Sequence, residues 1–195
     1  MSKNFDYSAN LSSALEKKLR NAKYLGEGHN GIVFILDNKK VIKFFKKVEV
    51  WKDESYILKK SRKSRFFPKI YEYNLGYIVR EFVGGVRLDK YLEKQQINEK
   101  LSEELYYMIL NFEKLGFSRL DLRCKDIFVQ SNLSVKIIDP KKNFEKYVPY
   151  PRQLMKGIYK RDSLELFLGY IKKRDFRRFT YWKYKIENYI KFDIK

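Results

Sequence analysis

Side chains that could handle a phosphate gather in three short segments of this 195-residue chain. Residues 26–33 read Gly-Glu-Gly-His-Asn-Gly-Ile-Val and are followed by Lys43, residues 119–126 contain Asp121, and an Ile-Ile-Asp triplet ends at Asp139. A glycine-rich loop can aim backbone N–H groups at phosphate oxygens, and a lysine can neutralise them. One carboxylate can take a proton from a hydroxyl, and others can bind magnesium. Together the segments predict phosphoryl transfer from ATP.

The glycine-rich loop places Gly26, Gly28 and Gly31 between two predicted strands. In the dinucleotide-binding fingerprint the third glycine would open a helix instead. A hairpin of this kind can fold over a triphosphate, and Val33 would then lie on the adenine ring. An ordinary glycine-rich hairpin without a ligand has the same residues, so the loop needs the support of the other segments.

Lys43 lies among apolar residues of a predicted strand, 41–45. A lysine in such a place needs an acidic partner or a phosphate, unless it points to solvent from the polar face of the strand. Glu54 can provide the ion pair from a predicted helix, 48–60. Glu54 is favoured over Glu49 because the helix would bury an apolar residue one turn after Glu54 on the same side.

The elements expected to position these residues change type near the middle of the chain. Apolar, β-branched runs indicate strands in the first half, and apolar residues at helical spacing indicate helices in the second. Gly84-Gly85 lies near the change and is the predicted hinge between two lobes. The predicted strands are 23–27, 32–36, 41–45, 69–73, 77–83, 127–130 and 135–138. The predicted helices are a short one before residue 22 (with Ser13 and Glu16 at capping-box spacing), 48–60, 88–94, 99–115, one containing 164–171, and 178–190, while 140–157 is expected to be irregular.

The order of the motifs resembles the protein-kinase-like superfamily, in particular small microbial eukaryotic-like Ser/Thr kinases with a reduced C-lobe, similar to RIO kinases in brevity. The resemblance rests on the pattern G-x-G-x-x-G-x-V, the strand lysine, the helix glutamate, the hinge-like stretch 78–85, and Asp121 and Asp139 placed eighteen residues apart. It runs from about residue 24 to 140, and the last 55 residues match loosely. It implies an α+β, two-lobed kinase-like fold. Residues 1–83 would form an N-lobe with an antiparallel sheet and one main helix, and residues 84–195 a short, mainly helical C-lobe.

The resemblance also implies roles for residues of the second lobe. Asp121 would orient the acceptor hydroxyl and take its proton. Arg123 stands where Ser/Thr kinases have a lysine that steadies the transferred phosphoryl group. Asp139 and Asp126 would bind magnesium. Asp162 resembles an aspartate that opens a buried helix and anchors the catalytic loop, and it can equally be a helix N-cap.

The adenine would be bound by backbone groups of the hinge. The resemblance assigns this role to the Glu81 carbonyl and to the backbone of Val83. The cofactors implied are ATP and Mg²⁺. Cofactor-binding residues are accordingly expected at positions spread along the first lobe: Gly26, Gly28, Gly31, Val33, Lys43, Glu54, Glu81 and Val83.

Several positions depart from the family pattern. Asp126 replaces an asparagine, and nearby Arg119, Arg123 or Lys125 could offset its charge. Arg119-Leu120 replaces the usual His-Arg. Pro140-Lys141 replaces Phe-Gly. Arg80 stands where a gatekeeper is normally apolar, so it must snorkel or pair with an acid. The segment 139–161 contains neither Ser nor Thr, so a site that needs no phosphorylation there is expected.

Bulk composition sets further limits. The formal net charge is +19, which fits either general composition or an acidic or RNA partner bound weakly and salt-dependently. Cys124 is the only cysteine, which excludes an internal disulfide and suits a reducing cytoplasm. No run of apolar residues is long enough to span a membrane, and the N-terminus lacks the apolar stretch of a signal peptide.

The sequence therefore favours an ATP-dependent phosphotransferase that acts on Ser or Thr of an unknown protein. Three alternatives stay open. A pseudokinase or ATP-binding scaffold would explain the altered residues 119, 120 and 126. A small-molecule kinase shares the Ile-Asp-Pro triplet at 138–140, although only 37 residues separate Val83 from Asp121. A RIO-like RNA- or ribosome-associated factor would use the basic charge.

Overall fold

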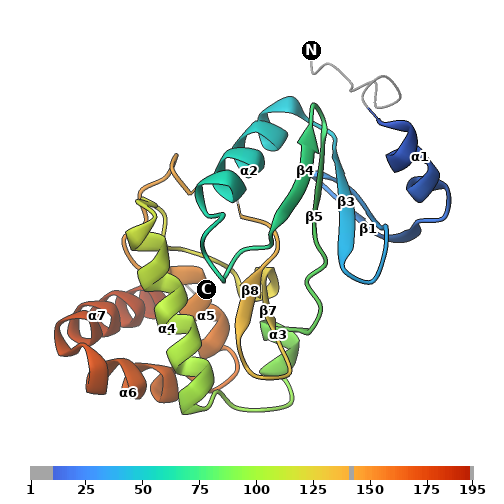
Figure 1. The fold of residues 1–195 in the computed structure, drawn as a ribbon. Helices are drawn as coiled ribbons and strands as arrows, with labels where there is room; N and C mark the ends of the chain where they lie inside the picture. Colours follow the sequence, from blue (N-terminus) through green and yellow to red (C-terminus); the bar gives the residue numbers. More distant parts are fainter. Residues whose placement is uncertain (1–10, 141–142, 194–195) are drawn as a thin grey trace. The chain divides into compact units, whose positions relative to one another are not determined.

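The computed structural model describes residues 11–140 and 143–193. The chain divides into two compact units, traced in Figure 1: Met1–Val83 with Asp139–Lys141, and Gly84–Ile138 with Lys142–Lys195. Asp139, which the sequence analysis grouped with the second half of the chain, therefore belongs to the first unit. That the two units correspond to kinase lobes stays a prediction.

A five-stranded antiparallel sheet forms the centre of the first unit. Its strand order is β1-β2-β3-β5-β4, so only the last two strands depart from sequence order. Every strand expected in this part of the chain is present, but the fifth ends two residues earlier than the sequence indicated. The bounds are β1 (Lys23–Gly28), β2 (Gly31–Ile35), β3 (Lys40–Phe45), β4 (Ile70–Asn74) and β5 (Tyr77–Glu81).

The two faces of this sheet are covered differently because side chains alternate along each strand. On one face, Ile42, Phe44, Tyr77 and Val79 form a core with Leu15 of helix α1 (Ser13–Arg20). The opposite face carries Lys43 and meets helix α2 (Val48–Lys60). Figure 1 shows the two helices on different sides of the strands.

Helix α1 begins one residue from the predicted cap. Ser12, rather than Ser13, is the N-cap, and its hydroxyl accepts a hydrogen bond from the Leu15 N–H. Both serines have the residue type that caps a helix, so the sequence pattern alone could not choose between them.

The second unit contains a small antiparallel sheet and most of the helices. The sheet has the order β6-β7-β8, with bounds β6 (Val86–Arg87), β7 (Ile127–Val129) and β8 (Val135–Ile137). Gly85, at the predicted hinge, has φ +90° and lies where an added Cβ would come within 2.4 Å of the Val129 carbonyl oxygen. The helices are α3 (Leu88–Tyr91), α4 (Glu99–Lys114), α5 (Arg152–Tyr159), α6 (Leu164–Arg174) and α7 (Phe176–Asp193), with a 3-10 turn at Cys124–Asp126.

Helix α5 corrects the expectation of irregular structure up to residue 157. Pro151 is at the N-cap of this helix, and Gly157 lies within it. The apolar residues of the segment, Leu154, Met155 and Ile158, are fully buried. Helix α3 is shorter than predicted, and α7 is longer at both ends.

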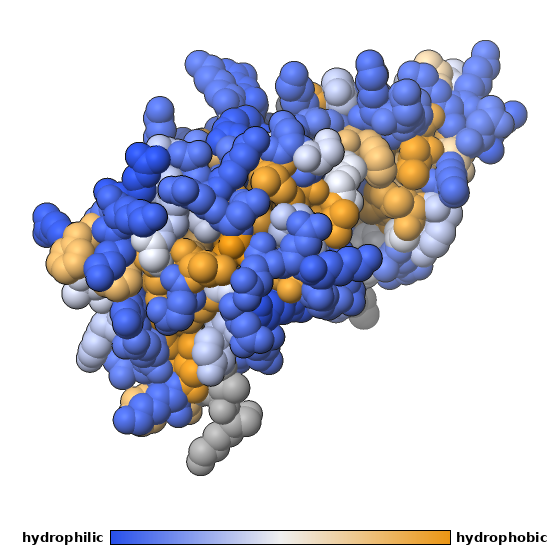
Figure 2. Space-filling view, turned by 90° about the horizontal axis from the view of Figure 1, so that it is seen from below, coloured by the Kyte–Doolittle hydropathy of each residue, from blue (hydrophilic) through white to orange (hydrophobic). Residues whose placement is uncertain are grey.

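The helical core of the second unit is formed by the apolar faces of α4, α6 and α7. Phe112, Phe167 and Trp182 are among its largest fully buried side chains. On the face shown in Figure 2, hydrophilic side chains surround smaller hydrophobic patches. Within the described ranges, no helix is both long and apolar enough to cross a membrane.

Candidate active site

Three of the predicted site residues meet inside the first unit. The Lys43 ammonium lies 2.5 Å from Oε2 of Glu54 and 3.1 Å from Oδ1 of Asp139. Lys43 comes from β3, Glu54 from α2, and Asp139 from the segment that returns to this unit after β8. Lys43 and Glu54 are buried, whereas the Asp139 side chain remains 25% exposed. We call these three residues the lysine cluster.

The local sequence explains why the lysine cluster forms. In the sheet, Lys43 is opposite Val33 on β2 and Ile78 on β5, so an apolar wall surrounds its stem. On α2, Glu54 is one turn before Leu58, which is buried. Burial alone would lower the pKa of Lys43, but Glu54 and Asp139 outweigh this effect and raise the pKa above its ordinary value. Lys43 therefore keeps its positive charge.

Arg80 adds a second buried cation to the same unit. Its Nη1 donates one long hydrogen bond, 3.4 Å, to the Glu81 carbonyl. Among the described residues, neither Nε of Arg80 nor Oε1 of Glu54 has a hydrogen-bond partner. Burial lowers the pKa of Arg80, and the charges of Glu54 and Asp139 oppose that shift. The gatekeeper-like arginine is thus balanced through space by the carboxylates of the lysine cluster rather than by a close ion pair.

The glycine-rich loop is a strand-to-strand turn, as predicted. Strand β1 ends at Gly28 and β2 begins at Gly31. A Cβ at Gly31 would lie 2.0 Å from the Phe44 carbonyl oxygen, so the close approach of β2 to β3 requires glycine there. At Gly26 and Gly28 an added Cβ would meet open space. The packing around Gly26 and Gly28 therefore does not require glycine at either position.

The residues expected to hold adenine lie near the end of the sheet. Val33 is half-buried on β2, Glu81 ends β5, and Val83 is buried. The backbone of Glu81 is already engaged, since its N–H donates to the Lys69 carbonyl and its carbonyl accepts from Arg80. Adenine binding by these groups stays a prediction.

Asp121 is buried in the second unit and depends on a helix that the sequence analysis missed. Its Oδ1 accepts a hydrogen bond from the backbone N–H of Gln153, in the first turn of α5. Burial raises the pKa of Asp121, while the Gln153 bond and the charges of Arg119 and Arg152 work against this shift. No motif pointed to Gln153, because its contribution is a backbone donor.

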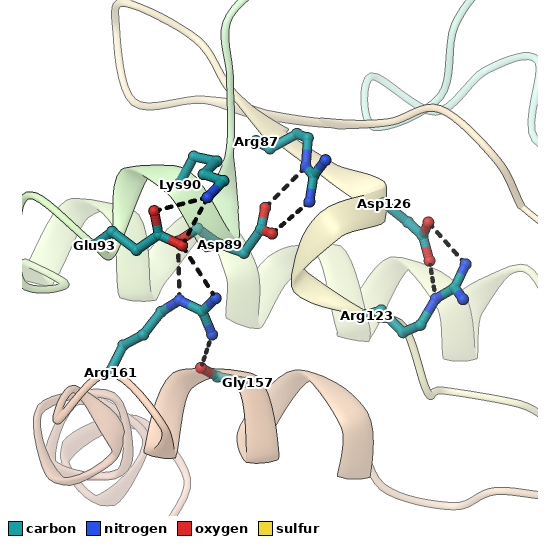
Figure 3. Close-up of polar contacts among 8 residues, drawn as sticks. All are labelled: Arg87, Asp89, Lys90, Glu93, Arg123, Asp126, Gly157 and Arg161. Atoms are coloured by element: carbon teal, nitrogen blue, oxygen red, sulfur yellow. Dashed lines mark hydrogen bonds and ion pairs between the residues drawn. The ribbon is translucent and has the colours of Figure 1, made fainter. Parts of the chain in front are cut away.

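Asp126 forms a two-pronged ion pair with Arg123 (Figure 3). Arg123 Nε lies 2.7 Å from Oδ2 of Asp126, and Nη2 lies 3.0 Å from Oδ1. The three-residue spacing comes from the tight turn Cys124–Asp126. The extra negative charge at position 126 is therefore offset by Arg123, one of the three candidates named from the sequence. Both oxygens of the predicted metal ligand are occupied in this state.

Arg161, rather than Asp162, ties the helices of this unit together. Arg161 donates to the carbonyls of Asp89, at 2.9 Å, and Gly157, at 3.0 Å, and also lies 3.7 Å from Glu93 (Figure 3). Asp162 is exposed and has φ 52°, and the N-cap of α6 is Ser163. The anchoring and capping roles expected of Asp162 are thus wrong. The Arg161 guanidinium has enough donors to join several carbonyls, but the resemblance to the kinase family directed attention to Asp162.

The predicted site residues therefore form two groups. Lys43, Glu54 and Asp139 are together in the first unit, and the turn 121–126 carries the second group. Their meeting around a single nucleotide stays a prediction. Within 11–140 and 143–193, no group of three His, Cys, Asp or Glu side chains could hold a metal ion. Magnesium bound through phosphates needs only one or two carboxylates, and the partly exposed Asp139 has the right chemistry.

Comparisons with known proteins assign the chain to no family. No family model and no curated protein matches it. A solved structure described as a co-crystal of WbdD and the kinase inhibitor LY294002 matches with 20% identity and a TM-score of 0.47. The match covers 60% of this chain and 32% of the other, so it spans about a third of that protein. The structure itself shows an α+β architecture with an antiparallel sheet. A match this weak assigns no activity.

Proposed function

We propose that this protein is a phosphotransferase that moves the γ-phosphoryl group of Mg-ATP to a hydroxyl, with Ser or Thr of a protein as the acceptor. The observation that carries the proposal is the buried lysine cluster. A fully charged lysine between two carboxylates, one of them partly exposed, suits the binding of a charged ligand better than it suits stability, because a buried ion pair contributes little to stability by itself.

Lys43 is the phosphate-binding cation in this proposal. Glu54 holds its ammonium in place, and the glycine-rich loop supplies backbone N–H groups nearby in the same sheet. Asp139, and Asp126 if it leaves Arg123, would hold magnesium, which when bound neutralises charge on the phosphate oxygens. Catalysis then depends on position and electrostatics, with no covalent intermediate on the protein.

Asp121 is the proposed proton acceptor. The acceptor oxygen forms a bond to the γ-phosphorus as the bond to the ADP oxygen breaks, and the hydroxyl proton passes to the Asp121 carboxylate. The Gln153 N–H donates to one oxygen of Asp121 and so holds the carboxylate in place for the substrate hydroxyl. Arg123 would steady the transferred group, for which it must exchange Asp126 for phosphate.

A second candidate is a protein that binds nucleotide without transferring phosphate. The two-pronged bond between Arg123 and Asp126 favours it, because that bond occupies both residues that the reaction would need. This candidate shares the lysine cluster with the first and differs only in the second unit.

The test is transfer of label from γ-labelled ATP, with magnesium, to generic protein acceptors and to the chain itself. Asp139→Asn removes the metal-binding carboxylate. Asp37→Asn is the matched control, since Asp37 is in an exposed turn and its side chain accepts from the nearby Lys39 N–H. Transfer that disappears in Asp139→Asn and persists in Asp37→Asn supports the phosphotransferase.

Two other results would decide against it. Nucleotide binding with no transfer to any acceptor, in both the parent and Asp37→Asn, would favour the binding-only candidate. Transfer to a small molecule and not to protein would reject the Ser or Thr acceptor while retaining the reaction.

A further inference from the structure

The basic side chains around helix α7 fall into two sets. Toward α4, the cations are neutralised. Arg174 lies 3.6 Å from Glu103, and Arg178 lies 2.6 Å from Glu113 and 3.1 Å from Asp175. These cations are already neutralised by carboxylates of the folded protein, so they attract a charged partner only weakly.

Toward α5, the cations have aromatic neighbours, and Arg152 also acts on a nearby carboxylate, that of Asp121. Arg152 and Lys156 of α5 lie 5.0 and 5.1 Å from the ring centroid of Tyr189, and Lys185 lies 5.8 Å from that of Tyr181. In the described part of the chain, none of these three cations forms an ion pair with a carboxylate. We call the group the α5–α7 surface, and it consists of Tyr150, Arg152, Lys156, Tyr181, Lys185 and Tyr189.

The rings of the α5–α7 surface are near one another and reach solvent. Tyr150 and Tyr181 meet edge to face, with centroids 6.4 Å apart. Tyr181 is 40% exposed. Figure 1 shows α5 beside α7, as the contacts between their side chains require.

A stripe of the same character continues along the outer side of α7. Arg177, Tyr184 and Lys191 follow each other at intervals of seven residues, so they share one side of the helix. All three are exposed. At 1.5 Å per residue the stripe is about 21 Å long. Cations and tyrosines thus alternate over a length that suits several nucleotides of an extended strand.

We propose that the α5–α7 surface binds single-stranded RNA. Lys156 and Lys185, which form no ion pair with a carboxylate among the described residues, can attract phosphates, and the exposed Tyr181 ring can stack on an unpaired base whatever its identity. RNA presents such bases in loops and at ends. An acidic protein would use the cations without needing the rings, and a membrane-surface helix would need a broad apolar face, whereas this surface combines cations with tyrosine hydroxyls. The net charge of +19 adds a general attraction for any nucleic acid.

The proposal does not depend on phosphotransfer, although the two sites are neighbours. Arg152 acts on the charge of Asp121, and Gln153, next to it, donates to the Asp121 carboxylate. RNA bound at the α5–α7 surface therefore lies close to the proposed proton acceptor. The binding test below is independent of any transfer assay.

The first experiment measures the fluorescence anisotropy of a labelled, unstructured RNA of about 12 nucleotides as the full chain is added. The double variant Lys156→Gln/Lys185→Gln is compared with Lys172→Gln/Lys173→Gln, which removes the same charge from exposed lysines of α6. We expect the first to weaken binding at least tenfold more than the second. We also expect it to reduce the slope of log affinity against log salt by about 1.4, since each phosphate contact to a single strand contributes about 0.7.

The second experiment separates stacking from charge. Tyr181→Ala is expected to weaken binding about tenfold, the loss typical of one base–ring contact. The control is Tyr107→Ala on α4, since Tyr107 is 42% exposed and Tyr181 is 40% exposed. Tyr181→Phe keeps the ring and should bind like the parent, which guards against a loss caused by misfolding.

Three results would overturn the proposal. Equal losses in the two lysine pairs would show that binding follows overall charge and not this surface. Duplex RNA bound as tightly as the single strand would exclude stacking on unpaired bases. Poly-glutamate or anionic vesicles bound in preference to RNA would assign the surface to a different partner.

Discussion

The two groups of candidate residues are built in opposite ways. In the lysine cluster, three residues far apart in the sequence meet in the interior of one unit, and Lys43 is 6% exposed. In the turn 121–126, Arg123 and Asp126 are three residues apart, and the Arg123 side chain is 40% exposed. The first group depends on the whole sheet and on α2, whereas the second depends on one tight turn.

This difference teaches how firmly each group is fixed. Removing one partner of a buried pair leaves a buried charge without compensation. Any rearrangement of the lysine cluster that separates its charges is therefore strongly destabilising. The Arg123–Asp126 pair is open to solvent on the Arg123 side, although the Asp126 side chain is only 10% exposed, so Arg123 can exchange its partner more readily than Lys43 can. A site that must hold a nucleotide in place and release a product would use the rigid group for the nucleotide and the exchangeable group for the transferred phosphate.

The largest expected effect is on the transfer rate, and it separates the role of the turn 121–126 from that of the lysine cluster. Asp121→Asn should lower the transfer rate by about 10²- to 10⁴-fold, because the proton acceptor is lost. Nucleotide affinity should be unchanged, since the lysine cluster is untouched. Single-turnover transfer and equilibrium nucleotide binding measure the two quantities. A rate like that of the parent would remove Asp121 from the mechanism.

The pH dependence tests the same carboxylate. Burial raises the pKa of Asp121, so transfer should fall on acidification at a pH above about 3.9, the ordinary aspartate value. Because the pKa of Asp121 is raised, ionising this carboxyl group destabilises the folded state. The protein therefore has its full stability below the ordinary aspartate pKa and loses stability as pH rises through the folded-state pKa. Asp121→Asn should therefore be more stable than the parent at neutral pH, with the difference vanishing in acid, as measured by urea unfolding across pH.

The rigidity of the lysine cluster is tested by Lys43→Met. Glu54 would remain buried without its cation, at a cost of roughly 3–5 kcal/mol in the free energy of unfolding. Lys46→Met is the control, because the Lys46–Glu27 pair is exposed and should cost no more than about 1 kcal/mol. Urea unfolding measures both losses. Similar losses in the two variants would mean that the buried pair contributes no more to stability than the exposed pair does.

The glycine-rich loop sharpens the comparison within the first unit. Gly31→Ala should destabilise the protein by about 3 kcal/mol, because its Cβ would meet the Phe44 carbonyl. Gly26→Ala should leave stability nearly unchanged and weaken nucleotide binding, if the loop covers phosphates. Thermal unfolding and nucleotide titration distinguish the two. Tight nucleotide binding by Gly26→Ala would argue against the phosphate cover.

The smallest effect on stability is expected in the turn 121–126. Arg123→Gln should lower the free energy of unfolding by less than Lys43→Met does, because solvent reaches the Arg123 side of the pair, although Asp126 is largely buried. It should free Asp126 and so tighten magnesium binding in the presence of nucleotide. Isothermal titration with magnesium measures this change, and unaltered affinity would show that Asp126 is not a ligand.

Local patterns predicted the sheet of the first unit well because its strands are short, β-branched and separated by turn residues. Helix α2 was predicted at 48–60 and is found at Val48–Lys60. The Lys43–Glu54 pair could be inferred because a buried lysine in a strand demands an acid, and helical spacing selected Glu54 over Glu49. Hydrophobic periodicity and charge compensation act locally, so the sequence displays them.

Contacts made by backbone groups or across long separations could not be read in the same way. Gln153 serves Asp121 through its N–H, which every residue but proline possesses. Helix α5 was missed; Pro149 and Pro151 precede it, and Gly157 lies within it. That glycine is required by tertiary packing, since a Cβ there would lie 2.4 Å from the Cys124 sulfur. The roles of Arg80 and Arg161 likewise depend on which distant groups surround them.

The return of the chain to the first unit at Asp139 has a consequence for biosynthesis. All strands of the five-stranded sheet are encoded before residue 84, but Asp139 leaves the ribosome 56 residues after Val83 (139 minus 83). At the usual speed of translation this delay is about 3–11 s. A nascent sheet can therefore fold with Lys43 paired to Glu54 alone. The second carboxylate joins late, so an unfinished chain, or a fragment truncated after Val83, lacks the group proposed to bind metal.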